Sequence, residues 1–156
     1  MDCVISMLAA GRTGQSGAED EAGPGKSDLA TAKVVRKHWG EERWLVAEGS
    51  PFGFKLIRVL AGRRTSLQYH CHKEEANLVL CGEGRLYSAE ARDSPVTESA
   101  LLPGQIVHVR PGAVHRIEAV TDLVIVEVST PELDDVIRIE DDSGRSSGRI
   151  AAEHTA

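Results

Sequence analysis

Four side chains that can bind a divalent metal ion lie close together near the middle of the chain: Gln68, His70, His72 and Glu75. Gln68, His70 and His72 occupy every second position, so in an extended strand they would point to the same face. A further imidazole, that of His115, follows a separate Pro-Gly turn. Imidazole, carboxylate and amide groups together suit zinc first, with manganese, iron, cobalt or nickel as alternatives, rather than a thiolate-bound metal. The sequence therefore predicts a site for one divalent metal ion.

Both groups of ligands lie beside a turn between two strand-like segments. Glu75 follows a short turn after His72 and precedes an apolar run over 76–81, which ends at Gly82. The second stretch has an apolar run over 106–109 and a Pro-Gly turn, and its next alternating run begins at His115. Two such corners must meet in the fold if His115 is to join the other ligands.

Short segments that alternate or are rich in apolar residues continue along the chain, separated by turns that contain Gly, Pro and Asp. They lie at 34–40, 43–47, 52–60, 65–70, 76–81, 84–89, 96–102, 106–109, 115–119 and 123–129. Many short strands at regular spacing predict an all-β fold, an antiparallel sandwich or barrel. A short helical turn is expected after these strands, with Thr130 as its cap and Pro131 at its first position.

Length and composition predict one folded domain over 31–142. Residues 1–30 and 143–156 lack a sustained apolar period, so we expect a flexible arm and a flexible tail; an edge strand over 1–8 is the alternative for the arm. The net charge of -6 gives no reason to expect nucleic acid or an anionic membrane as a partner. Without an apolar run of about 18 residues, no membrane span is expected, and we predict a cytoplasmic protein.

The three cysteines, Cys3, Cys71 and Cys81, show no CxxC spacing and are expected to be reduced. Strand alternation places Cys71 on the opposite face from the neighbouring histidines. A buried core thiol is therefore predicted at this position.

The spacing between Gly62 and Gly82 resembles the first motif of the cupin family, in which two ligands, a Glu and a final Gly follow an initial Gly at set intervals. Gln68, His70 and Glu75 fit these intervals without a gap, whereas starting from His70 and His72 leaves the distance to Glu75 too short. The resemblance implies a single jelly-roll domain, an antiparallel double-stranded β-helix. It also implies that the metal ligands are Gln68, His70, Glu75 and His115, with His72 in reserve.

Further segments resemble the cupin domain of the type II mannose-6-phosphate isomerases. They are His38-Trp39-Gly40, Lys55, the run from Ser66 to Glu75, His115-Arg116, Glu127-Val128, Asp134 to Arg138, and Gly144-Arg145. This resemblance implies metal-dependent interconversion of mannose 6-phosphate and fructose 6-phosphate. Lys73 stands where the family usually has Arg, and Ala76-Asn77 stands where it usually has His-Trp.

An aldose-ketose isomerase must stabilise negative charge on oxygen, which a metal ion and nearby cations can do. Lys55, Lys73 and Arg138 are the candidate catalytic cations, each with a solvated surface charge as the alternative role. A sugar phosphate is the expected partner, together with a second copy of the chain in a homodimer. Two other functions stay open: a small-molecule-binding cupin without catalysis, and a metal-dependent dioxygenase.

Overall fold

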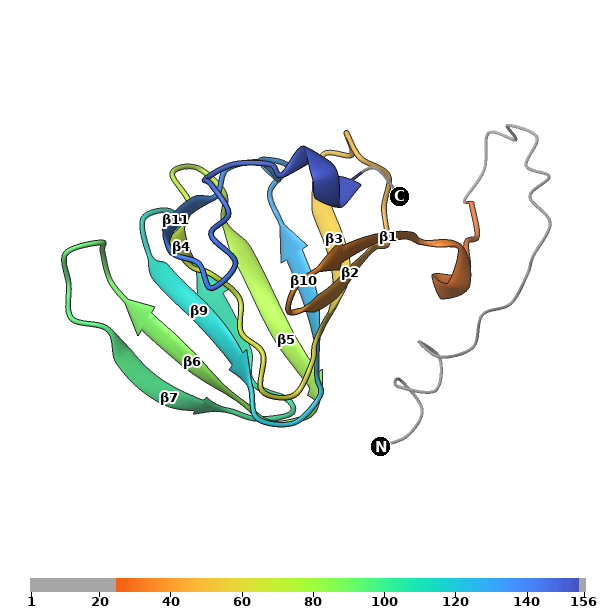
Figure 1. Cartoon of the computed structure of the whole chain (residues 1–156). Coiled ribbons are helices and arrows are strands. Elements are labelled where there is room, and N and C mark those ends of the chain that lie inside the picture. Colours follow the sequence, from red (N-terminus) through yellow and green to blue (C-terminus); the bar gives the residue numbers. More distant parts are fainter. Residues whose placement is uncertain (1–24, 155–156) are drawn as a thin grey trace.

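The computed structural model describes residues 25–154, which form two antiparallel sheets that face each other (Figure 1). The first sheet contains, in spatial order, β1 (Lys33–Lys37), β2 (Gly40–Trp44), β3 (Gly53–Val59), β10 (Leu123–Ser129), β5 (Glu75–Cys81) and β8 (Ile106–Val109). The second contains β11 (Ile137–Glu140), β4 (Leu67–Tyr69), β9 (Val114–Ala119), β6 (Gly84–Ala89) and β7 (Thr97–Leu101). This architecture confirms the predicted all-β, antiparallel jelly roll.

The interior between the sheets has an apolar end and a polar end, because the inward positions of the central strands change character along their length. The apolar end is a cluster of Trp39, Ile57, Val59, Val79, Leu101, Ile117, Ala119, Leu123 and Ile125. Further along the same strands, the inward positions carry Lys55, Glu75 and Glu127, which are also buried. In the register of the sheet, Glu127 of β10 lies opposite Lys55 of β3. A charged site is thus built into the barrel beside a hydrophobic core.

The segment after β10 differs from its prediction. No helix forms at Thr130 and Pro131; instead, the Thr130 hydroxyl accepts a hydrogen bond from the Glu74 backbone N–H at 3.1 Å. The Asp135 carboxylate accepts hydrogen bonds from backbone N–H groups of the turn after β4, including that of Lys73 at 2.9 Å. These tertiary contacts replace the local cap, and the chain continues into β11, a strand that the sequence pattern did not predict.

Residues 143–154, expected to be part of a flexible tail, make defined contacts and include the 3-10 helix η2 (Ala151–His154). Arg145 pairs with Asp141 at 2.6 Å and with Glu153 at 3.1 Å, and Glu153 pairs with Lys37 of β1 at 2.6 Å. This segment therefore packs against the first sheet. The predicted arm up to residue 24, the alternative strand at 1–8, Cys3 and the last two residues lie outside the described residues.

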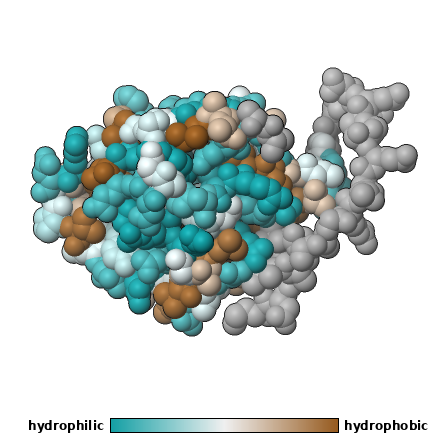
Figure 2. All heavy atoms as spheres, in the orientation of Figure 1, coloured by the Kyte–Doolittle hydropathy of each residue, from teal (hydrophilic) through white to brown (hydrophobic). Residues whose placement is uncertain are grey.

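The surface view in Figure 2 is mainly hydrophilic, with hydrophobic residues in separate small groups. Among the described residues, no helix has the length and apolar character needed to cross a membrane.

Cys81 is buried, but Cys71 is exposed, so the prediction of a core thiol at Cys71 is wrong. The reason is that β4 ends at Tyr69, so strand alternation no longer applies at Cys71.

Candidate metal centre

The two predicted corners meet in the second sheet. β4 pairs with β9 in an antiparallel register that places Gln68 opposite His115. The backbone N–H of Gly112 donates a hydrogen bond to the His70 carbonyl at 2.7 Å, which ties the second turn to the end of β4. Gly112 has a φ of 85°, a conformation that glycine adopts at little steric cost. The fold thus brings together ligands that are far apart in the sequence.

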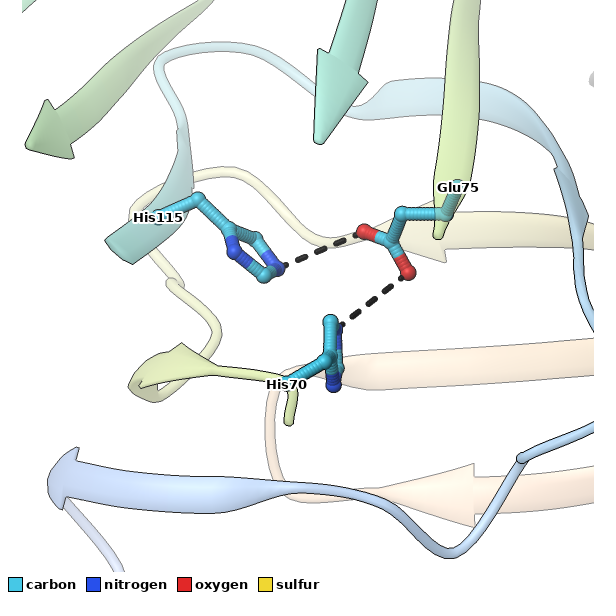
Figure 3. A group of neighbouring side chains, drawn as sticks. All are labelled: His70, Glu75 and His115. Carbon is cyan, nitrogen blue, oxygen red and sulfur yellow. Dashed lines mark ion pairs between the residues drawn. The ribbon is translucent and has the colours of Figure 1, made fainter. Parts of the chain in front are cut away.

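His70, Glu75 and His115 form a buried group whose potential ligand atoms all lie within 4.8 Å of one another. His70 Nε2 lies 3.5 Å from Glu75 Oε2, and His115 Nε2 lies 3.3 Å from Glu75 Oε1. Figure 3 shows both rings directed at the carboxylate from separate segments of the chain. Two nitrogen donors and one carboxylate suit a zinc, manganese or iron ion.

Nδ1 of each imidazole contacts a backbone carbonyl, and this contact determines whether Nε2 carries a hydrogen or a lone pair. His70 Nδ1 bonds the Asp135 carbonyl, and His115 Nδ1 lies 3.4 Å from the Ala113 carbonyl. Because a carbonyl only accepts, Nδ1 carries the hydrogen, and Nε2 of a neutral ring then presents a lone pair. A lone pair facing a carboxylate requires a cation between them, and His70 Nε2 is buried without a hydrogen-bond partner. The three residues therefore fit a bound metal ion.

Gln68 lies beside this group. Its Nε2 is 3.5 Å from His115 Nε2, while its Oε1 accepts a hydrogen bond from the Ser66 hydroxyl at 2.5 Å. The two ends of a side-chain amide have nearly the same shape, so a half-turn would direct Oε1 to His115 and leave Nε2 on Ser66. Gln68 can then supply the fourth ligand.

His72, the reserve ligand, lies apart from the group. Its side chain is exposed, and its backbone N–H donates to Asp135 Oδ2 at 2.5 Å. The turn after β4 directs this residue outward, so alternation along the strand does not extend to it. His72 is not placed to join His70, Glu75 and His115.

Two neighbours hold the Glu75 carboxylate in place and keep it ionised. Lys73 Nζ lies 2.5 Å from Oε2, and Asn77 Nδ2 donates to Oε1 at 3.0 Å. Burial by itself would raise the pKa of Glu75, but the charge of Lys73 outweighs it and holds this pKa well below its usual value. Glu75 is thus a preformed anionic ligand.

Both predicted catalytic lysines are buried inside the barrel and are not solvated surface charges. Lys73 also contacts Glu127 at 3.0 Å, and Lys55 contacts Glu127 at 3.6 Å and Glu42 at 3.4 Å. Burial lowers the pKa of each lysine, but Glu127 and the other carboxylates outweigh it, so both pKa values are raised. Lys55 and Lys73 are therefore fixed ammonium groups.

Arg138, the third predicted cation, is half-buried in the lining of the same cavity, and its strand β11 pairs it with Gln68 of β4. Its guanidinium donates to the carbonyls of Gly148, at 2.9 Å, and Ser146. Among residues 25–154 it forms no ion pair with a carboxylate, and its buried Nε has no hydrogen-bond partner. Asp141, Glu153 and Glu42 act on its charge only from a distance, so Arg138 has no direct carboxylate partner in this part of the chain.

The cavity that joins these groups has a volume of about 110 Å³. Gln68, Glu75 and His115 line it together with Lys55, Lys73 and Arg138, and Trp39 and Trp44 form part of its wall. Sequence reasoning gave no role in this site to Glu42 or Glu127. A signal was present for Glu127, which is an acidic residue at an inward position of the otherwise apolar strand β10.

Two facing antiparallel sheets with a buried His-Glu-His group between them define a cupin-type domain. Residues 24–141 match the family described as mannose-6-phosphate isomerase C-terminal, and the chain belongs to this family. The match confirms the resemblance seen in the sequence. None of the curated proteins compared with the chain matches it.

Solved structures with the same fold include the capsular polysaccharide assembling protein CapF from Staphylococcus aureus, with a TM-score of 0.61 and 19% identity over 70% of this chain and 32% of that one. Oxalate decarboxylase from Lactobacillus farciminis, in a formate complex, has a TM-score of 0.62 and 15% identity over 77% of this chain and 37% of that one. Oxalate decarboxylase from Bacillus subtilis, described with Mn(II) centres, has a TM-score of 0.61 and 16% identity over 72% of this chain and 31% of that one. The chain spans about a third of the length of these proteins, and the likeness concerns the fold.

Proposed function

We propose that this chain is a metal-dependent isomerase that interconverts an aldose phosphate and a ketose phosphate, with mannose 6-phosphate and fructose 6-phosphate as the pair. The observation that carries the proposal is the buried group of His70, Glu75 and His115, which adjoins a cavity lined by fixed cations. Membership of the mannose-6-phosphate isomerase C-terminal family supports the choice of substrate.

The reaction requires removal of a proton next to a carbonyl, and its barrier is mainly the negative charge that builds up on oxygen. His70, Glu75 and His115, with Gln68, would hold the metal ion. When bound, a divalent cation supplies Lewis-acid polarisation of a substrate oxygen. Lys73 and Lys55 add fixed positive charges in a site shielded from water, where such charges stabilise a developing oxyanion strongly. They need no reorganisation, because their carboxylate partners already hold them in place.

Arg138 is the residue proposed to bind the phosphate group. It lies at the cavity without an ion pair to any carboxylate of the described residues, and a guanidinium can donate two parallel hydrogen bonds to phosphate oxygens. Lys55 and Lys73 are less suited to this task, since their ammonium groups are held in contact with Glu42, Glu75 and Glu127. A phosphorylated sugar would thus be oriented between Arg138 and the three metal ligands.

The test is an isomerase assay on purified protein whose metal content has been measured. Formation of fructose 6-phosphate from mannose 6-phosphate, with much slower turnover of unphosphorylated mannose, is the expected result. Protein that holds stoichiometric metal and converts no hexose or pentose phosphate would refute the proposal. In that case, thermal stabilisation by a sugar phosphate without product would favour the non-catalytic alternative.

A further inference from the structure

Glu127 occupies a central position among the charged groups of the cavity and has no role in the chemistry described so far. It is buried on β10, and its Oε1 lies 3.0 Å from Lys73 Nζ and 3.6 Å from Lys55 Nζ. The same Lys73 ammonium contacts the Glu75 carboxylate at 2.5 Å. A single ammonium group therefore separates Glu127 from a proposed metal ligand.

Isomerisation requires a base that reaches a carbon next to the polarised oxygen, at a heavy-atom distance of about 2.6–3.2 Å. The two lysines in the cavity do not meet this need, because each is held between two carboxylates, Lys73 by Glu75 and Glu127 and Lys55 by Glu42 and Glu127, and an ammonium group has no lone pair to accept a proton. Glu42 pairs with Lys37 and Lys55 and accepts a hydrogen bond from the Trp44 indole at 3.2 Å, and among residues 25–154 it forms no ion pair with Lys73, the lysine that contacts Glu75. The remaining acidic side chain of the cavity lining, that of Asp134, is 59% exposed.

We propose that Glu127 is the acid–base residue of the isomerisation, an inference that rests on the proposed function. Its carboxylate takes the proton from C2 of the aldose phosphate, and the electron pair of that C–H bond becomes the C1–C2 double bond while the carbonyl pair moves to O1. The protonated Glu127 then returns the proton to C1, and the O2 hydroxyl proton passes to O1 as the C2 carbonyl forms. Glu127 ends unchanged, and no oxidant or reductant is needed.

The position of Lys73 fits this exchange. Its ammonium bridges Glu75 and Glu127, so one fixed positive charge adjoins both the proposed base and a proposed metal ligand. Lys55 stays beside Glu127 at 3.6 Å, and Asn77 is the neutral residue opposite it in β5.

The decisive variant is Glu127→Gln in the full chain, because glutamine keeps the shape and can still accept a hydrogen bond from Lys73 but cannot take the proton. We expect kcat to fall by about 10²–10⁴-fold, the range typical of a lost general base, with KM little changed. Exchange of the substrate C2 hydrogen with deuterium from the solvent, followed by NMR, should be lost in parallel. Metal content should equal that of the wild type. A purely structural role would not remove the exchange while leaving KM and metal binding intact.

Two further variants complete the experiment. Glu127→Asp keeps a carboxylate on a shorter side chain and should restore part of the exchange, which keeps the inference testable if the glutamine variant folds poorly. Glu98→Gln removes an exposed carboxylate that pairs with Arg85 on the surface, away from the cavity lining, and should leave the exchange rate close to that of the wild type. An active wild type together with a Glu127→Gln protein that retains wild-type exchange would refute the role of Glu127. A wild type that shows neither exchange nor turnover refutes the proposed function itself, before any variant is compared.

Discussion

Replacing Lys73 by methionine tests whether the cation between the two carboxylates holds the site together. Lys73 is 4% exposed and contacts both Glu75 and Glu127. Removing one partner of a buried ion pair costs about 3–5 kcal/mol, because a charge is left buried without compensation. For a chain of this size each kcal/mol lowers Tm by about 2–4 °C, so the variant should melt roughly 6–20 °C below the wild type in the presence of a chelator.

Addition of a divalent cation should then raise Tm more in Lys73→Met than in the wild type. A bound cation would compensate Glu75 in place of the missing ammonium, and ligand binding to the folded state adds directly to stability. The measurement is a thermal melt followed by circular dichroism, with chelator and with zinc or manganese.

Lys33→Met is the matched control, because it removes a lysine that pairs with Glu48 at the surface, where the two side chains are 37% and 44% exposed. Exposed pairs contribute at most about 1 kcal/mol, so its Tm should change little. A Lys73→Met protein with the same Tm as the Lys33→Met control would show that Lys73 does not stabilise the site.

Four other results are expected. The pKa of Glu42 is depressed to about 2 from its usual 4.5, so the wild type should lose stability as pH falls through this interval. In thermal melts recorded at each pH, Tm of Glu42→Gln should fall less over this interval than Tm of the wild type. Elemental analysis should find stoichiometric metal in His72→Ala but not in His115→Ala; equal metal in both would contradict the ligand assignment. Arg138→Gln should raise KM for mannose 6-phosphate by about 10–100-fold, since a hydrogen bond to a charged group contributes about 1.5–3 kcal/mol. An unchanged KM in steady-state kinetics would exclude Arg138 as the residue that binds the phosphate group. A homodimer is expected through the outer face near Ile106, which is 68% exposed on edge strand β8. Ile106→Glu should then yield a monomer in sedimentation experiments. A wild-type monomer would contradict the expectation.

Much of the fold follows from local rules. Alternating side chains and turns rich in Gly and Pro are enough to predict the strands, because each strand buries one face and each turn needs a residue with special backbone freedom. The expected segments at 106–109 and 123–129 coincide with β8 and β10. The strand β11 was not predicted, since it forms through pairing with β4 rather than through a strong pattern of its own.

For the site, alternation along the strand left Gln68, His70 and His72 as equal candidates, and the resemblance of the spacing to the cupin motif nominated Gln68, His70, Glu75 and His115. Whether the two corners meet is decided by long-range pairing, such as that of Gln68 with His115. The exclusion of His72 likewise depended on where the turn after β4 directs the chain.

The charge environment of the site was decided by tertiary structure alone. Lys73 and Glu127 are 54 positions apart in the chain, and Lys37 and Glu153 are 116 apart, so no local pattern indicates that they pair. In the sequence each is an ordinary charged residue that water could solvate. Burial in the barrel removes that water and makes each charge depend on a partner from a distant segment. The sequence therefore determined the types and spacing of the metal ligands. The fold determined which cations and carboxylates surround them.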